Sequence, residues 1–75
     1  MLDKIIDILR SVYKIRNEAI TLETTLDELG LDSLERVELV IDLEGEFNVK
    51  FTDDDILYMK NVDDLVNTII RNKGN

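Results

Sequence analysis

Apolar side chains recur along this chain at the spacing of an α-helix. Near both ends they stand three and four residues apart, which places them on one side of a helix that must bury this stripe. The pattern therefore predicts an all-α fold. Lys14 and Arg16 are expected in the last turn of the first helix, where cations suit the helix dipole. The stripes are Leu2, Ile5, Ile6, Leu9, Val12 and Tyr13 near the start, and Val62, Leu65, Val66, Ile69 and Ile70 near the end.

A capping-box pattern marks the start of a second main helix, expected over 32–47. Asp32 is the better N-cap, because Glu35 then stands three residues on and can accept a hydrogen bond in return. With Ser33 as the cap, Arg36 would hold that position and could not accept one. Ser33 is therefore expected at the first helical position, with a hydroxyl that the helix does not need.

Two further caps predict the rest of the fold. Thr52 is expected to cap a short helix over 53 to about 59, with three acids in its first turn. Asn61 is expected to cap the last helix, which Gly74 follows as a stop. We therefore predict a small four-helix bundle, with three main helices and one short helix, in a single domain over 1–75.

A long connection over 17–31 separates the first two main helices. Within it, Thr25 and Glu28 form another capping-box pattern, and Gly30 ends the short turn that follows. A loop of this length in a compact domain is usually functional or disordered, and its leucines argue against disorder. Three of them are expected to pack onto the core: Leu22, Leu26 and Leu29.

The second main helix has three faces when its residues are stepped at about 100° each. One apolar stripe is an ordinary core face, and an acidic stripe lies between it and a second apolar stripe. That second stripe has two interpretations: it packs inside, or it forms a docking face beside the acids for a basic partner. The core stripe is Leu39, Val40, Leu43 and Phe47; the acids are Glu35, Glu38, Asp42 and Glu46; the second apolar stripe is Leu34, Val37 and Ile41.

The absence of cysteine and histidine limits the chemistry. It excludes a disulfide, a zinc site built from these residues, and Ser–His or Cys–His nucleophiles. We therefore predict that the chain is not an enzyme and holds no metal. Any thiol that it uses must be attached afterwards or supplied by a partner.

The charge is strongly negative and unevenly placed. The chain has 17 acids and 9 bases, a net charge of −8, which argues against nucleic acid as a partner. Most acids lie over 18–64, and this surface either keeps the chain soluble or attracts basic partners. The sequence shows no apolar run that would span a bilayer and no signal-peptide pattern. We expect a cytoplasmic monomer with no membrane insertion.

The stretch from Leu26 to Leu34, LDELGLDSL, resembles the signature of acyl carrier proteins. The match continues through VEL at 37–39 and LEGEF at 43–47, and the size, acidity and helix order of nearly the whole chain are similar to that family. The tripeptide Asp-Ser-Leu alone is weak evidence for this family. Here it is strong evidence, because it follows Leu-Gly at a helix start and precedes an acidic helix. Two residues depart from the family pattern: Arg36, and Gly45, where the family often has an acid.

The resemblance, to the stand-alone type of carrier, implies a function. Ser33, beside the motif residue Asp32, would carry a 4′-phosphopantetheine arm through a phosphodiester, and the thiol of the arm would hold acyl groups as thioesters. The implied partners are a phosphopantetheinyl transferase and the acyl-transferring and chain-extending enzymes of fatty acid, polyketide or related lipid biosynthesis. Their basic docking surfaces would meet Glu35, Glu38 and Asp42 and the apolar Leu34, Val37 and Ile41.

The family also sequesters an acyl chain between its second and third helices. The side chains that are candidates for such a cavity here are equally candidates for the core. They are Val37, Leu43, Phe47, Ile56, Leu57 and Leu65.

Other functions fit part of the same pattern. A peptidyl or aminoacyl carrier shares the fold and the serine, although the acidic helix favours the acyl type. An unmodified acidic adaptor would need only the acidic face and would be unaffected by Ser33→Ala. Calcium binding at residues 53–55 is set aside, because adjacent acids lack the alternating ligand spacing of an EF-hand loop.

Overall fold

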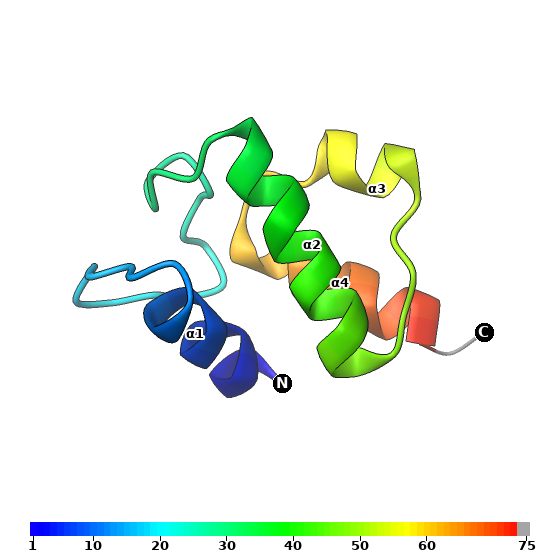
Figure 1. Ribbon diagram of the computed structural model, residues 1–75, viewed down its shortest axis with the longest axis horizontal. Helices are drawn as coiled ribbons and strands as arrows, with labels where there is room; N and C mark the ends of the chain where they lie inside the picture. Colours follow the sequence, from blue (N-terminus) through cyan, green and yellow to red (C-terminus); the bar gives the residue numbers. More distant parts are fainter. Residues whose placement is uncertain (74–75) are drawn as a thin grey trace.

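The computed structural model describes residues 1–73 and contains four helices in sequence. They are α1 (Leu2–Ser11), α2 (Ser33–Phe47), α3 (Asp53–Tyr58) and α4 (Val62–Lys73), arranged with α2 between α1 and α3 (Figure 1). This confirms the predicted all-α bundle with a long connection after α1. The predicted stop at Gly74 lies outside the described residues. Within 1–73, no helix has both the length and the apolar character needed to cross a membrane.

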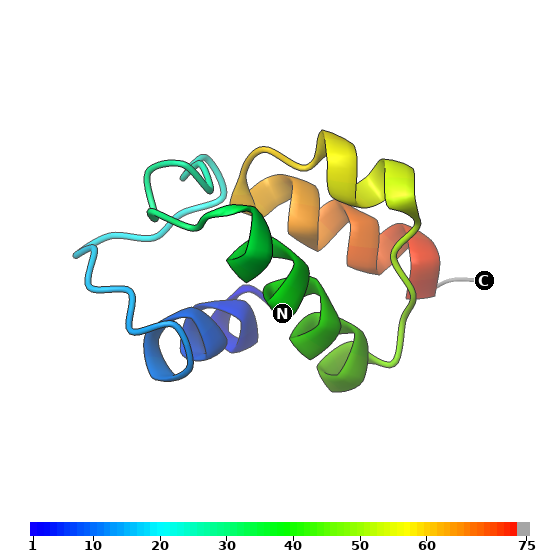
Figure 2. The same ribbon diagram turned by 45° about the horizontal axis from the view of Figure 1, so that its top comes forward.

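The core is built by α1, α2, α4, the long loop and the connections on either side of α3, which supply Val49, Phe51 and Met59, while α3 itself contributes no buried side chain. α4 passes behind α2 in Figure 1, and turning the molecule shows it between α2 and α3 (Figure 2), so that α2 and α4 form the centre of the bundle. The short α3 covers this centre chiefly through the partly buried Ile56. The side chains with no exposed surface are Ile5, Leu9, Leu26, Leu39, Leu43, Val62, Leu65 and Ile69.

The predicted capping box at the start of α2 is present in full. The backbone N–H of Glu35 donates to Asp32 Oδ1 at 2.8 Å, and the backbone N–H of Asp32 donates to Glu35 Oε1 at 3.1 Å. These two bonds satisfy backbone donors that a helix start leaves without partners. Ser33 is consequently the first helical residue, as the sequence predicts.

The other predicted caps are also confirmed. Thr52 and Asp55 form a reciprocal box at the start of α3, which ends one residue earlier than expected, at Tyr58. The side chain of Asn61 accepts from the backbone N–H of Asp64 at 2.9 Å at the start of α4.

Asp55 also joins α3 to α4, because its carboxylate accepts from Arg71 at 2.6 Å. The backbone hydrogen bond from Thr52 is the largest of the contacts that hold the pKa of the Asp55 carboxyl below its ordinary value.

The long loop is ordered by its own turn and by backbone contacts with the start of α4. Thr25 and Glu28 bond reciprocally, at 2.9 Å and 3.0 Å, and Gly30 follows with a φ of +76° that favours glycine. The backbone N–H of Leu26 donates to the carbonyl of Lys60, and that of Val62 donates to the carbonyl of Thr24, each at 2.9 Å. The loop thereby fixes the chain that leads into Ser33.

The first helix ends earlier than the sequence predicts. It stops at Ser11, so Lys14 and Arg16 lie beyond it and the base in its last turn is Arg10. Lys14 adopts a φ of +58°, and the backbone N–H of Ile15 bonds back to the carbonyl of Leu9 at 3.1 Å. This backward bond turns the chain and brings Ile15 against the core. The helix therefore ends although the apolar spacing would allow it to continue.

Three expected core residues lie at the surface. Leu22, predicted to attach the loop to the core, is 36% exposed, and Ile70 on α4 is 57% exposed. Val12, predicted in the buried stripe of the first helix, follows the end of α1 and is also 57% exposed. The loop residues buried in the core are instead Ile20 and Leu31, besides the predicted Leu26 and Leu29. Loop residues follow no helical period, so the side each one faces depends on tertiary contacts.

Gly45 offers a test of the helix itself. Gly45→Ala is expected to raise the free energy of unfolding by up to about 1 kcal/mol, because alanine is the better helix former. A Cβ at this position meets no atom within 4 Å, so packing does not oppose the change. The urea midpoint would measure the effect.

Gly30→Ala is the matched control. Its Cβ also meets no atom within 4 Å, but its φ of +76° is strained for alanine, so its midpoint is expected to fall. A fall in the midpoint of Gly45→Ala would contradict this account of the helix.

Candidate functional site

Ser33 stands at the first position of α2, at the surface and at the end of the ordered loop. Because Asp32 supplies the cap, the Ser33 hydroxyl has no hydrogen-bond partner within residues 1–73. Nothing in the described part of the chain therefore needs to be broken before this oxygen reacts. The site is a free hydroxyl on a rigidly capped helix start.

Arg36 fixes the backbone on the approach to Ser33. Its Nε donates to the carbonyl of Leu31 at 3.2 Å, and its guanidinium forms an ion pair with Asp27 in the preceding turn. These contacts hold the side chain against the loop and away from the acidic stripe. Sequence reasoning had found the departure from the family pattern at this position but not the contacts that it makes.

The second apolar stripe of α2 faces solvent. Leu34 is 69% exposed, Val37 42% and Ile41 60%, so the interpretation that they pack inside is wrong. The neighbouring α3 exposes Leu57 and Tyr58, both 69% exposed. Exposed leucines and isoleucines beside acids are typical of a surface that another protein covers.

The acyl-cavity candidates do not share one environment. Leu43 and Leu65 are fully buried in the core, whereas Leu57 is exposed at the surface of α3. Phe47 and Ile56 are partly buried against the core. In this structure the six residues therefore belong partly to the core and partly to the outer face.

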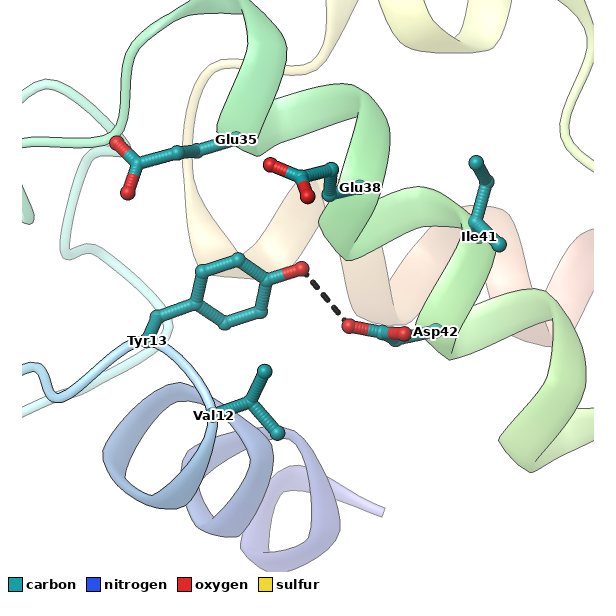
Figure 3. A pocket seen from close by; sticks show the side chains of 6 residues that line it. All are labelled: Val12, Tyr13, Glu35, Glu38, Ile41 and Asp42. Carbon is teal, nitrogen blue, oxygen red and sulfur yellow. Dashed lines mark hydrogen bonds between the residues drawn. The ribbon is translucent and has the colours of Figure 1, made fainter.

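The acidic stripe of α2 faces the end of α1, across an open pocket with a volume of about 530 Å³. Glu35, Glu38 and Asp42 line one side of it, and Val12 and the ring of Tyr13 lie opposite (Figure 3). The Tyr13 hydroxyl donates to Asp42 Oδ2 at 2.8 Å. Sequence reasoning placed Tyr13 in the stripe of α1 and missed this contact, which joins residues far apart in the chain.

Tyr13 is held in its neutral, donating form. Its partial burial raises the pKa of the phenol above the ordinary value, and the hydrogen bond to Asp42 and the nearby charges of Glu38 and Glu35 raise it further. The hydroxyl therefore keeps donating to Asp42 over the whole neutral range. This bond directs the Asp42 carboxylate toward the pocket.

The concentration of acids leads to a prediction about stability. Sodium chloride or Mg²⁺ is expected to raise the melting temperature, because screening weakens repulsion among carboxylates in a chain with a net charge of −8. A gain of about 1 kcal/mol would shift it by about 4–8 °C. Within residues 1–73 no three acids are grouped as metal ligands, so salt at matched ionic strength should act much as Mg²⁺ does. A melting temperature that neither raises would contradict this account.

Comparison with known proteins identifies the family. The family described as "Phosphopantetheine attachment site" matches residues 3–69. An acyl carrier protein of Syntrophobacter fumaroxidans is 39% identical over 72 residues, which cover 95% of this chain and 89% of that protein. One from Clostridium perfringens is 39% identical over 70 residues, 92% of each chain. An acyl carrier protein homolog of Mycoplasmopsis pulmonis is 37% identical over 59 residues, 79% of this chain and 81% of that protein.

A solved structure agrees with these sequences. The crystal structure of an acyl carrier protein from Thermotoga maritima matches this fold with a TM-score of 0.86 and 30% sequence identity. The match covers 95% of this chain and 84% of that one. The sequence motif, the helix order and the relatives therefore lead to one conclusion. The chain belongs to the acyl carrier protein family and contains a phosphopantetheine attachment site.

Proposed function

We propose that Ser33 is the residue to which the phosphopantetheine arm is attached. The observation that carries this proposal is the free, exposed hydroxyl of Ser33 at the start of α2, where Asp32 and Glu35 supply the cap without it. The sequence contains two serines, and the other, Ser11, donates its hydroxyl to the carbonyl of Asp7 at 2.7 Å at the end of α1. Ser33 is thus the serine available for a phosphodiester.

The arm supplies the thiol that the chain lacks. An acyl carrier protein is not an enzyme: it holds its cargo as a thioester and presents it to the enzymes that act on it. With no cysteine in the sequence, the thiol of the arm is the only one present, so the cargo has a single attachment point. Tethering gives each partner active site a high effective concentration of the intermediate.

Two opposing electrostatic effects would act on a phosphate attached to Ser33. The first backbone N–H groups of a helix lack intrahelical acceptors, and they favour a phosphate nearby. The carboxylates of Asp32 and Glu35 repel the same phosphate. We therefore assign no gain in stability to the attached phosphate. The rigid cap serves instead to hold the serine in one orientation for the modifying enzyme.

The outer face of α2 is the proposed contact surface for partners. Members of this family work with a phosphopantetheinyl transferase and with biosynthetic enzymes. We propose that Glu35, Glu38 and Asp42 meet arginine and lysine on those enzymes. The exposed Leu34, Val37 and Ile41 would supply the apolar contacts.

The proposal extends to the group that is carried and to the kind of pathway that uses it. Because the curated relatives are named acyl carrier proteins, we propose acyl groups of fatty acid, polyketide or related lipid biosynthesis rather than aminoacyl groups. We further propose that the chain forms one carrier domain, supported by a single cluster of buried residues from α1, α2, α4 and the connecting segments. A cytoplasmic location remains a prediction, which cell fractionation would test.

Loading assays test the proposal. The purified chain would be incubated with a phosphopantetheinyl transferase and coenzyme A or acyl-coenzyme A, and its intact mass measured. We expect one phosphopantetheine or acyl-phosphopantetheine per chain. Transfer from an acyl-activating enzyme should exceed transfer from an aminoacyl-activating enzyme. A preference for aminoacyl groups would overturn the cargo assignment, and no gain on a folded, unmodified chain would overturn the attachment.

A further inference from the structure

The pocket beside Tyr13 is part of a longer groove between α1 and α2. A second hollow with a volume of about 440 Å³ adjoins it and shares Val12, Ile41 and Asp42 as lining residues. The second hollow continues along α2 past Gly45 to Glu46. The groove therefore begins at Glu35, in the first turn of α2, and follows the acidic stripe.

The two walls of this groove differ in chemistry. The α2 wall carries the carboxylates of Glu35, Glu38 and Asp42, whereas the α1 wall offers the side chain of Val12 and the aromatic ring of Tyr13 (Figure 3). Lys4 approaches only the far end of the stripe, where its Nζ lies 3.9 Å from Glu46 Oε2. A groove with acids on one side and apolar surface on the other is complementary to a long basic side chain.

We infer that the end of α1 belongs to the docking surface, with Val12 and Tyr13 forming the second wall of a socket for an arginine or lysine of the enzyme that modifies Ser33. This inference rests on the proposed role of Ser33. The charged group would sit among the carboxylates, and its methylene stem would lie against Val12. The Tyr13 ring adds a face that attracts cations. An enzyme that acts on Ser33 must cover the first turn of α2, where the groove begins.

Tyr13 acts in this socket as a positioning residue. By donating to one oxygen of Asp42 at 2.8 Å, its hydroxyl fixes the carboxylate and leaves the other oxygen for the incoming cation. The helix α2 alone would present Asp42 as a mobile surface acid. The hydrogen bond makes it part of a defined wall, so partner selection depends on α1 as well as α2.

A cation placed in the groove tests the inference. Val12→Lys would put an ammonium group opposite the acids at a residue that is 57% exposed, so little packing is lost. Ile70→Lys is the matched control: it makes the same change in charge at an apolar residue that is also 57% exposed, on α4. The C-terminal end of α4 and α1 lie on opposite sides of the molecule in both views (Figures 1 and 2).

The assay is modification of each full-length variant by a phosphopantetheinyl transferase with coenzyme A. Val12→Lys is expected to raise the KM for the carrier by about five- to tenfold, the size of a lost or repelled charge contact, with little change in kcat. Ile70→Lys should stay near the parent KM. Val12→Gln removes the apolar contact but adds no charge, so it should raise the KM far less than Val12→Lys does. The melting temperature of Val12→Lys should not fall, since the new cation faces carboxylates.

Each outcome decides a separate question. Equal KM values for Val12→Lys and Ile70→Lys, with both variants modified, would overturn the inference and leave the role of Ser33 standing. A KM for Val12→Gln as high as that for Val12→Lys would show that size rather than charge matters, and would also overturn it. Failure of the parent chain to be modified at all would instead overturn the proposed function.

Discussion

Ser33→Ala is expected to abolish attachment of phosphopantetheine completely. The substitution removes the oxygen that forms the phosphodiester, and no neighbouring hydroxyl occupies the same place at the start of α2. The fold should persist, because Asp32 and Glu35 supply the capping box and alanine is a good helix former. We expect its stability to remain within about 0.5 kcal/mol of the parent. Intact mass after treatment with a phosphopantetheinyl transferase and coenzyme A measures the effect.

Ser11→Ala is the matched control for this experiment. Ser11 is the other serine of the chain and also lies within the region that matches the family, but its hydroxyl is bonded to the carbonyl of Asp7. We expect Ser11→Ala to be modified as fully as the parent. Modification of Ser33→Ala would contradict the assignment. Retention of biological activity by an unmodified Ser33→Ala chain would favour an acidic adaptor over a carrier.

Leu43→Ala is expected to cause the largest loss of stability. Leu43 has no exposed surface and lies in the core stripe of α2. Replacing a buried leucine with alanine costs about 2–5 kcal/mol, from lost burial and the cavity left behind. A domain of this length has a total stability of roughly 4–11 kcal/mol, and no disulfide reinforces it. Denaturant unfolding should show a much lower midpoint, with part of the chain unfolded in buffer.

Leu34→Ala separates stability from docking on the same helix. Leu34 is 69% exposed, so the same chemical change should alter the free energy of unfolding by less than about 0.5 kcal/mol. It should instead weaken the encounter with partner enzymes, because it removes an apolar contact from the outer face. A loss of less than about 1 kcal/mol in Leu43→Ala would contradict the burial argument. A large loss of stability in Leu34→Ala would contradict its place on the docking face.

Features that depend on residues close together in the chain could be predicted from the sequence. The capping boxes at Asp32 and Thr25 depend on partners three residues away, so the pattern itself specifies the contact. The same holds for the helix stripes, since their period follows from helix geometry. The free hydroxyl of Ser33 follows from the same local pattern, because Asp32 rather than Ser33 is the cap.

Features that depend on contacts between distant segments could not be predicted. The hydrogen bond between Tyr13 and Asp42 joins residues 29 positions apart, and no local pattern specifies it. The early end of α1 depends on the backward bond from Ile15 to Leu9. The two interpretations of Leu34, Val37 and Ile41 were equally compatible with the helix period. Their exposure depends on where α3 packs, and α3 leaves that face of α2 open.

Localising the added group on the modified parent chain tests the central claim most directly. The chain would be treated with a phosphopantetheinyl transferase and coenzyme A, and the product fragmented in a mass spectrometer. We expect one phosphopantetheine per chain, present in every fragment that contains Ser33 and absent from fragments that end before it or begin after it. Attachment at Ser11 or at a threonine, or no attachment to a folded and previously unmodified chain, would contradict the account.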